Sequence, residues 1–517
     1  MQKNNPKVLN AWAFYDWANS VHSLTITSAI FPIYYPFAAV SASGNKEIDF
    51  LGMHLSNTVI FSYTVSCAFL LLAILMPLLS GIADYKGNKK SFMRFFCYLG
   101  SFSCISLYFF EKGNYYVGTF GFLFSIIGWG GSMVFYNSFL PEIASPDRFD
   151  QLSAKGFTMG YIGSVLLLIQ NLTMVMMPQW YGNLSGDLAS RISFLSVGIW
   201  WLVFAQIPFH YLPEGNKRMH RGENIWLGGW KELKKVYEEV KNIGALKRFL
   251  ASFFLFNMGA QTVMFLGALF GSEELHLPTD ALIITILLIQ LVAIPGAYFC
   301  AKLSQRFGNI QALLAIVIVW VAICGFAYTV NDQFNFYLLA TGIGFVMGGI
   351  QSNSRATFAK MCPPNEQDTS SYFSFYDVMD KVSTVAGTFT FGIELSQPIA
   401  PGTADALDAP AGLCRDVEER NELKERRARL EQVVVHRAVR VVADGAVLLH
   451  RLVGAHERPA LLHVARVAGV VDVVAHQHLL ARRALAAGDD RAGVTHAASW
   501  RRRLARDESD DRLRKVL

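Results

Sequence analysis

The stretch SGIADYKGNKK, residues 80–90, recurs in altered form as AKLSQRFGNI, residues 301–310. A constant offset of 221 residues pairs Asp84 with Gln305, Gly87 with Gly308 and Asn88 with Asn309. Glycine permits a tight turn, and small residues let two helices approach closely. Two such loops, each placed after the second apolar run of its half of the chain, predict a duplicated unit of membrane-crossing helices.

The composition is typical of a polytopic membrane protein. Of the 517 residues, 52% are hydrophobic and 17% charged, and the mean hydropathy is +0.31. A helix that crosses a hydrocarbon core of about 30 Å needs roughly 20 mostly apolar residues. Eleven runs fit this requirement: residues 18–40, 58–80, 92–110, 115–138, 156–178, 191–211, 249–270, 281–301, 311–330, 334–354 and 371–394.

The distribution of basic residues predicts the orientation. With a cytoplasmic N-terminus, the inside segments hold about 21 Lys and Arg, whereas the outside loops hold Lys46, Lys112 and Arg191. We therefore expect an integral multi-pass protein of a bacterial inner membrane with its N-terminus in the cytoplasm. Eleven crossings then leave residues 398–517 outside.

The longest connection between runs, residues 212–248, separates six runs from five. It contains WLGGWKELKKVYEEVK, in which Leu233, Val236, Tyr237 and Val240 form one apolar helical face. This pattern fits a cytoplasmic helix on the membrane surface, and it fits equally a solvated linker helix. The expected domains are residues 1–211, the linker 212–248, residues 249–397 and a tail, 398–517.

The tail differs in composition from the rest of the chain. It contains 19 Arg and 2 Lys but none of the 39 Phe or 19 Tyr. So few aromatic residues leave little material for a core and predict a disordered or poorly ordered segment. Two explanations are open for the origin of the tail: a fused basic domain, or translation of DNA in an unintended frame. The change occurs within FTFGIELSQPIAPGTAD, residues 389–405.

Several stretches resemble one family. They are AWAFYDWANS (11–20), VFYNSFLPEIA (134–144), GYIGS (160–164), GGIQSNSRATFAKM (348–361) and SYFSFYDVMDK (371–381). Together with the repeated loop they resemble the vacuolar amino-acid effluxer-like branch of the major facilitator superfamily, over residues 8–397. The resemblance implies an all-α membrane fold of two related six-helix halves, here with about eleven spans and the twelfth replaced. Gln305 and Asn88 depart from the superfamily pattern.

The resemblance also implies a function. The chain is expected to be a secondary transporter that moves a small polar solute, with amino acids as candidates, by alternating access. Proton or other ion coupling is a further expectation. The alternative is a non-transporting protein, either a sensor or an inactive truncated product, because the last helix of the second half has no counterpart.

In the superfamily fold the first helix of each three-helix unit lines the central cavity, which implies spans one, four, seven and ten as the pathway. These spans carry polar residues that suit a small polar solute, and their alternative role is hydrogen bonding between helices. The candidates for the substrate pathway are Asn19, Asn137, Asn257, Gln261 and Gln351.

Charged residues in the spans are candidates for gating or coupling, because burying a charge in a membrane costs about 2.5–3.5 kcal/mol on insertion scales. Asp16, Glu142 and Arg355 come near the cytoplasmic face and suit a gate latch, or a static ion pair. Asp84 belongs to the first signature loop. Asp377, Asp380 and Lys381 stand at i, i+3 and i+4 on one helical face, where they can neutralise one another or couple transport to protons.

Other function classes find no support in the sequence. We find no phosphate-binding loop, nucleophile triad or nucleic-acid patch, and the seven cysteines lack metal-ligand spacing. We expect a monomer in the lipid bilayer that is not an enzyme and needs neither a cofactor nor a metal.

Overall fold

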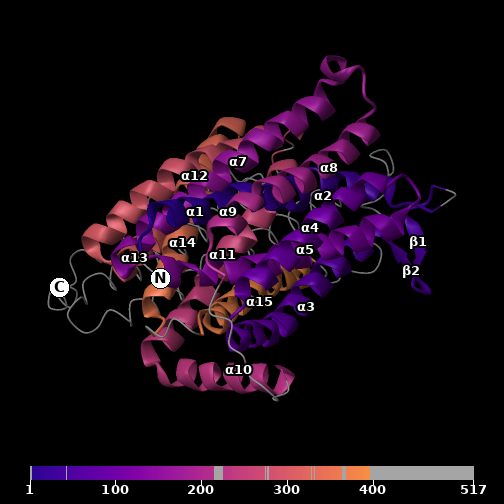
Figure 1. The fold of residues 1–517 in the computed structure, drawn as a ribbon. Helices are drawn as coiled ribbons and strands as arrows, with labels where there is room; N and C mark the ends of the chain where they lie inside the picture. The colour runs from indigo at the N-terminus through magenta and orange to yellow at the C-terminus, as the bar shows by residue number, and fades with distance from the viewer. Residues whose placement is uncertain are drawn as a thin grey trace, which may run out of the picture.

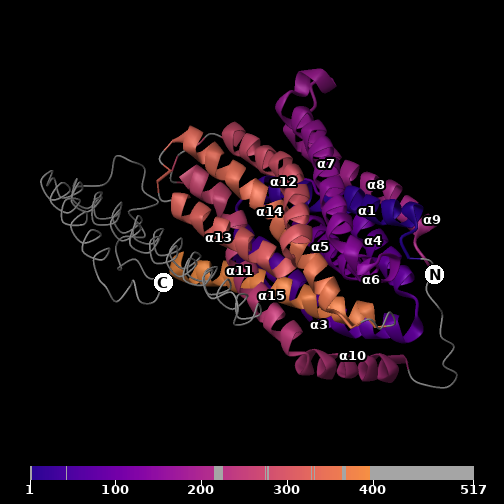
Figure 2. The same ribbon diagram turned by 90° about the vertical axis from the view of Figure 1, so that its left-hand side faces the viewer.

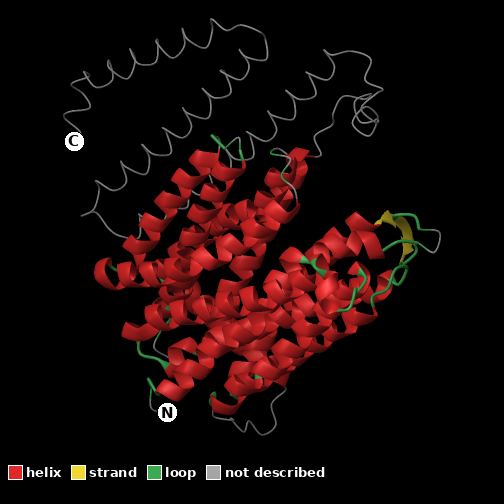
Figure 3. Cartoon of the chain, turned by 90° about the horizontal axis from the view of Figure 1, so that it is seen from above, coloured by secondary structure: helices red, strands yellow, loops and turns green. Residues whose placement is uncertain are grey.

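The computed structural model describes residues 3–41, 44–214, 225–273, 275, 277, 279–327, 329–330, 332–363 and 368–395, and helices dominate it (Figures 1 and 3). The predicted tail, 398–517, lies outside the described residues. The elements are α1 (Pro6–Val21), α2 (Phe31–Ala38), β1 (Glu47–Phe50), β2 (Met53–Ser56), α3 (Asn57–Lys86), α4 (Lys89–Ser106), α5 (Tyr115–Ser138), α6 (Leu140–Ile143), α7 (Phe149–Met176), α8 (Gly186–Phe204), α9 (Gln206–Tyr211), α10 (Ile225–Asn242), α11 (Gly244–Glu273), α12 (Thr279–Phe307), α13 (Asn309–Ala327), α14 (Gln333–Met361) and α15 (Thr369–Leu395).

The helices form two bundles that lie side by side (Figure 2). We call α1–α9 the first half and α11–α15 the second half. The linker end of the molecule is the end where α3, α5 and α14 finish and α7 and α15 begin; the hairpin end carries β1 and β2. The division predicted at residues 211 and 248 stays a prediction, although α9 ends at Tyr211 and α11 begins at Gly244.

Eight helical segments within the described residues are long and apolar enough to cross a membrane. They correspond to the predicted spans 58–80, 92–110, 115–138, 156–178, 191–211, 281–301, 311–330 and 334–354. The total of eleven spans stays a prediction.

The predicted first span, 18–40, is not one continuous helix. Helix α1 begins at Pro6, with Asn5 as its N-cap, and a π-helical segment from His22 to Ala29 separates it from α2. In this segment the amide of Ile30 donates to the carbonyl of Thr25 at 2.9 Å. Pro32 and Pro36 follow, and neither can donate a backbone hydrogen bond. Asp16 therefore lies inside α1 rather than at the start of a helix, and the bounds of the first membrane span stay a prediction.

A small antiparallel hairpin departs from the all-α prediction. Strands β1 and β2 pair Glu47 with Ser56 and Phe50 with Met53. Leu51 and Gly52 form the turn with φ of 53° and 81°. Two positive φ angles define the turn that suits a tight hairpin, but this turn usually has Asn or Asp before Gly. Leu51 in that place explains why the sequence pattern did not reveal the hairpin.

The two signature loops take the conformation that their glycines predict. Gly87 ends α3 with φ 65°, and Gly308 follows α12 with φ 91°. Each amide closes the last helical turn: Gly87 bonds the carbonyls of Ala83 and Asp84, and Gly308 bonds that of Ser304 at 2.9 Å. A left-handed residue after a helix favours glycine, so the duplication seen in the sequence is also one of backbone geometry.

Close helix packing in the first half depends on paired glycines. Gly100 of α4 and Gly128 of α5 face each other with their backbones in contact, and a Cβ on Gly128 would also lie 2.7 Å from the carbonyl oxygen of Phe96. The fully buried ring of Trp201 fills the space beside Gly100. Small residues at a helix crossing let the backbones approach, as is common in membrane proteins.

Helix α10 lies outside the two bundles, along one edge of the molecule (Figures 1 and 2). Gly228 and Gly229 pack on Tyr85 and Ile82 of α3, and Val236 is fully buried. A second face carries large side chains that are more than half exposed: Trp226, Leu227, Trp230 and Tyr237. Of the predicted apolar face, Val236 and Val240 are buried, whereas Tyr237 is exposed.

Candidate functional site

A buried ion pair joins the two halves at the linker end. Nη1 and Nη2 of Arg355 on α14 each lie 3.3 Å from Oδ2 of Asp16 on α1, and the two side chains are 2% and 3% exposed. Tyr136 on α5 donates to the same oxygen at 2.8 Å. The guanidinium also donates to Oδ1 of Asn137 at 3.2 Å, and to the carbonyl and Oγ of Ser153 at 2.9 Å each. Both charges are thus paired and hydrogen-bonded, as buried charges must be.

Aromatic rings enclose the Arg355 guanidinium. Its carbon lies 4.1 Å from the ring centre of Phe157, 4.9 Å from that of Trp12 and 5.6 Å from that of Tyr136. Gly156 completes the enclosure, because a Cβ there would overlap the Asp16 carboxylate. The cation therefore gains cation–π contacts in addition to its ion pair. Two of the predicted gate residues, Asp16 and Arg355, meet here.

The third predicted gate residue, Glu142, lies in a separate cluster. It forms an ion pair with Lys89, at the start of α4, and accepts a hydrogen bond of 3.1 Å from Thr369, at the start of α15. Lys89 donates to Oγ1 of Thr369 and to the carbonyl of Ser138, both at 3.1 Å. Glu142 thus links the first half to α15 rather than to Arg355.

Asp84, the acidic residue of the first signature loop, caps a helix of the other half. Its two carboxylate oxygens accept from the amides of Ser370 at 3.2 Å and Ser371 at 2.6 Å. These amides belong to the first turn of α15, where they have no partner within the helix and where the helix dipole favours a negative charge. The signature loop of the first half is therefore bound to the second half.

Replacing Asp84 with alanine is expected to lower the free energy that holds the two halves together at the linker end by roughly 1 kcal/mol. Capping residues contribute about 0.5–2 kcal/mol to stability. The measurement is maleimide labelling of a Ser354→Cys reporter, which is buried in α14, with Cys67, Cys362 and Cys414 changed to serine. We expect faster labelling in Asp84→Ala.

The matched control is Asp332→Ala. Asp332 caps α14 through the amide of Asn335, at 2.8 Å and within one half. This variant loses a cap of the same type and is expected to leave the reporter unchanged. Equal labelling rates in Asp84→Ala and the unaltered chain would contradict a joining role for Asp84.

The second signature loop makes the equivalent contact with the first half, but with different chemistry. Asn309 donates at 2.6 Å to Asp150 at the start of α7, and Lys360 of α14 forms an ion pair of 2.6 Å with the same carboxylate. Gln151 donates to Gln305 at 3.4 Å. Gln305 occupies the place of Asp84 in the repeat, so a neutral amide pair replaces the charged cap.

Helix α10 bridges the same region. Lys235 forms an ion pair of 2.6 Å with Asp368, which precedes α15, and Tyr372 of α15 donates a hydrogen bond to Glu239. Burial and the neighbouring Asp368 carboxylate raise the pKa of Glu232. Because its other face packs on α3, α10 contacts both halves where Asp84 joins them.

A second charged cluster lies further along α15. The ammonium of Lys381 is 2.7 Å from Asp380 and 3.3 Å from Asp377, so the predicted i,i+4 pair forms and the neighbouring Asp380 joins it. Asn257 of α11 donates to Asp380 at 3.0 Å and to Ser383 at 2.7 Å. A residue predicted for the substrate pathway is thereby joined to residues predicted for coupling.

The other predicted pathway residues lie apart from this cluster. Asn137 belongs to the Arg355 network, and Gln351 accepts a hydrogen bond of 2.7 Å from Tyr161 across the two halves. Asn19 is buried in α1, and its amide nitrogen has no hydrogen-bond partner among the described residues. Gln261 is half-buried in α11. Their roles in the substrate pathway stay predictions.

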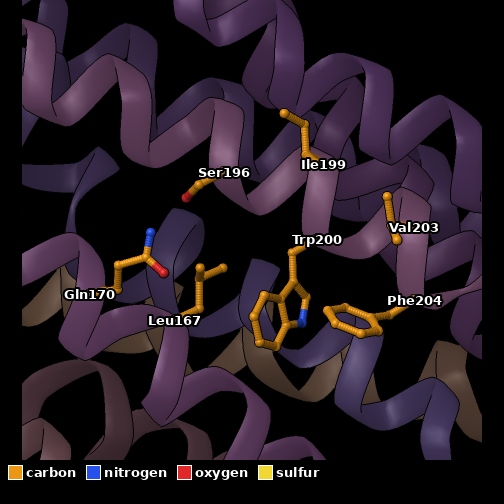
Figure 4. Close-up of a pocket in the computed structure, with 7 residues that line it drawn as sticks. All are labelled: Leu167, Gln170, Ser196, Ile199, Trp200, Val203 and Phe204. Carbon is orange, nitrogen blue, oxygen red and sulfur yellow. The ribbon is translucent and has the colours of Figure 1, made fainter.

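A shallow pocket of about 300 Å³ lies between α7 and α8 (Figure 4). Its wall is mainly apolar, and Ile199 and Val203 are 46% and 56% exposed. It contains none of the predicted pathway or gate residues. The pocket therefore has the character of a lipid-facing groove and is separate from the charged clusters. Its lining residues are Leu167, Gln170, Ser196, Ile199, Trp200, Val203 and Phe204.

Several residues of the polar network were not identified from the sequence. Lys89 and Asp150 were missed because they stand at helix ends, where charged residues are common. A signal for one was present: Lys89 follows the signature asparagine directly. For Asp150 and Lys360 no local signal exists, since they are 210 positions apart in the chain.

The chain matches known proteins over the described helices. The family model described as "Vacuole effluxer Atg22 like" matches residues 4–394. The uncharacterized MFS-type transporter YxiO of Bacillus subtilis is 30% identical over 394 residues, which cover 76% of this chain and 89% of that protein. Autophagy-related protein 22-1 of Penicillium rubens is 25% identical, over 70% of this chain and 74% of its own.

Solved structures show the same fold. FucP, a major facilitator superfamily transporter in the outward conformation, aligns with a TM-score of 0.59 at 13% identity, over 87% of this chain and 99% of that one. A bacterial homologue of ferroportin in an outward-facing state gives a TM-score of 0.56 at 12% identity, over 86% and 98%. With its repeated signature loops, its two helical halves and a family match over residues 4–394, the chain belongs to the Atg22-like vacuole effluxer family of major facilitator transporters.

Proposed function

We propose that this transporter moves a small polar solute by alternating access, with the linker end closed in the conformation described. The observation that carries the proposal is the set of buried polar contacts between the halves at the linker end, centred on Arg355 and Asp16. Ion pairs and helix caps can break and form again at lower cost than an apolar interface, because water solvates the separated groups. Such contacts suit a gate that opens in every cycle.

The linker end is proposed to face the cytoplasm of a bacterial cell, with the protein in the inner membrane. Within residues 1–397, most Lys and Arg residues outside the spans belong to segments at this end, including six between residues 225 and 248. The exposed face of α10 then lies at the membrane surface, where Trp226, Trp230 and Tyr237 suit the interface and Lys231 and Lys234 suit anionic lipid.

The proposed solutes are amino acids. Support comes from the polar side chains within the helices, among them Asn257 and Gln351, and from the vacuole effluxer relatives. Asp377, Asp380 and Lys381 are the proposed coupling residues.

Uptake by proteoliposomes tests the proposal. The full chain is reconstituted and supplied with a panel of labelled amino acids, with and without a proton gradient. We expect uptake of at least one of them above that of protein-free vesicles, and loss of this uptake in Arg355→Gln. An unaltered chain that takes up no member of the panel in either direction would rule out amino-acid transport.

A non-transporting protein is the second candidate, favoured by one observation: the family match ends at residue 394, and residues 395–517 lie outside it. A chimera tests this alternative. Residues after 394 are replaced with the corresponding segment of the Bacillus subtilis relative. Uptake by the chimera but not by the natural chain would show that the present C-terminal segment prevents transport.

A further inference from the structure

With both carboxylates ionised, the charged cluster on α15 carries an excess of one negative charge. Asp377 and Asp380 both contact Lys381, so two carboxylates share one ammonium. The ion pair of Arg355 with Asp16, in contrast, balances its charges. Asn257 adds a hydrogen bond to Asp380 but no charge. Because the side chains of Asp377 and Lys381 are only 8% and 6% exposed, the uncompensated charge lies in a poorly solvated place.

One position of the cluster is open. Oδ2 of Asp377 is buried and has no hydrogen-bond partner among the described residues. A buried acceptor without a partner loses its hydration and gains nothing in return, which costs about 1–3 kcal/mol and more for a charged group. Asp380, by contrast, keeps 25% of its side chain exposed. The cluster is therefore not fully enclosed by the described residues, and a buried acceptor without a described partner lies beside its exposed edge.

Aromatic residues of the first half face the cluster. Trp129 on α5 lies with its ring centre 5.1 Å from the Lys381 ammonium, and Phe69 on α3 lies at 6.0 Å. The indole N–H of Trp129 is also buried without a hydrogen-bond partner in the described part of the chain. Trp129 also stacks against His22, with ring centres 5.9 Å apart. The second half thus supplies the charges and the first half supplies the rings.

We infer that this cluster is a binding site for the primary ammonium group of the transported solute. The ammonium donates to Oδ2 of Asp377, packs against Trp129 and brings the charge of the cluster to zero. A solute held in this way touches both halves, so its binding is linked to their relative position. The assignment rests on the proposed transport function and narrows its substrate class to amines and amino acids with a free amino group.

The test compares three kinds of probe on the full chain in nanodiscs. For alanine, leucine and lysine we use the amino acid, its amide, which keeps the α-ammonium and lacks the α-carboxylate, and its N-acetyl derivative, which lacks the α-ammonium. Binding is measured from the shift in melting temperature over a concentration series. We expect amino acids and amides to bind, and N-acetylalanine and N-acetylleucine to fail.

Substitutions at the cluster complete the test. Asp377→Asn keeps the shape and removes the charge, and we expect it to weaken amide binding roughly tenfold or more, as for a hydrogen bond to a charged group. Asp377→Glu is expected to retain binding. Asp147→Asn, at an exposed position before α7, is the matched control and is expected to bind as the unaltered chain does. Each variant is first compared by its ligand-free melting temperature and its elution in size-exclusion chromatography.

The outcomes separate the site from the transport function. Equal binding of N-acetylalanine and alanine would overturn the ammonium site. Unchanged amide binding in Asp377→Asn would overturn it too. If Asp377→Asn also loses proton uptake, Asp377 would be assigned to binding a proton alone. Absence of binding by every probe would also overturn the ammonium site. Amide binding without uptake into proteoliposomes would keep the site and reject transport, whereas uptake that amides do not inhibit would keep transport and reject the site.

Discussion

Replacing Arg355 with glutamine is expected to destabilise the protein more than any other single charge removal at the linker end. The change leaves Asp16 buried with no cation beside it. Removing one partner of a buried ion pair lowers the free energy of unfolding by about 3–5 kcal/mol. It also removes the cation from between Trp12 and Phe157. The measurement is the unfolding midpoint in detergent, together with labelling of Ser354→Cys.

A second replacement distinguishes the ion pair from simple loss of packing. In Asp16→Asn/Arg355→Gln both charges are absent, so we expect less destabilisation than in Arg355→Gln alone. Arg148→Gln is the matched control, because Arg148 is exposed in the same region. If the separate effects of Asp16→Asn and Arg355→Gln on the unfolding midpoint add up to the effect of the double change, Asp16 and Arg355 are not energetically coupled.

Replacing Gly128 with alanine is expected to destabilise the first half by about 1–3 kcal/mol, the usual cost of overpacking. The added Cβ meets the backbone of Gly100 and the carbonyl oxygen of Phe96, and neither can move as a side chain can. Helices α4 and α5 must therefore separate. The measurement is the unfolding midpoint in detergent and the yield of monodisperse protein.

Gly186→Ala is the control for this change. Gly186 begins α8, and a Cβ there meets nothing within 4 Å. Alanine is also the better helix former, so the control is expected to be neutral or slightly stabilising. A Gly128→Ala protein as stable as the control would show that the backbones of α4 and α5 are not in contact.

The candidate site was only partly predictable from the sequence. Gly87 was identifiable because both copies of the repeat have glycine at the turn, and Asp84 because it is the acidic residue of the first loop. The pairing of Asp377 with Lys381 was also predictable, because residues four apart share a helix face, whereas the contact between the neighbours Asp380 and Lys381 does not follow from that rule. Glu142 was grouped with Asp16 and Arg355 as a gate residue, and its contacts with Lys89 and Thr369, which are far from it in the sequence, could not be predicted.

Local backbone geometry limited the prediction of the fold in two places. The π-helical segment after Val21 and the hairpin turn at Leu51 and Gly52 use residues that are equally common in ordinary helices and loops. Hydropathy does not distinguish these conformations. It located the long apolar helices well, because crossing a membrane needs a length of apolar sequence whatever the local geometry.

The sequence by itself determined the class of protein, most of the apolar spans, the duplicated loops and the family, since each depends on residues close together or repeated along the chain. Only the tertiary structure decided which charges meet. Arg355 and Asp16 are 339 positions apart, and Asp84 caps a helix that begins 285 residues later. A buried charge takes the partner that helix packing brings within hydrogen-bonding distance, and that packing is a property of the whole bundle.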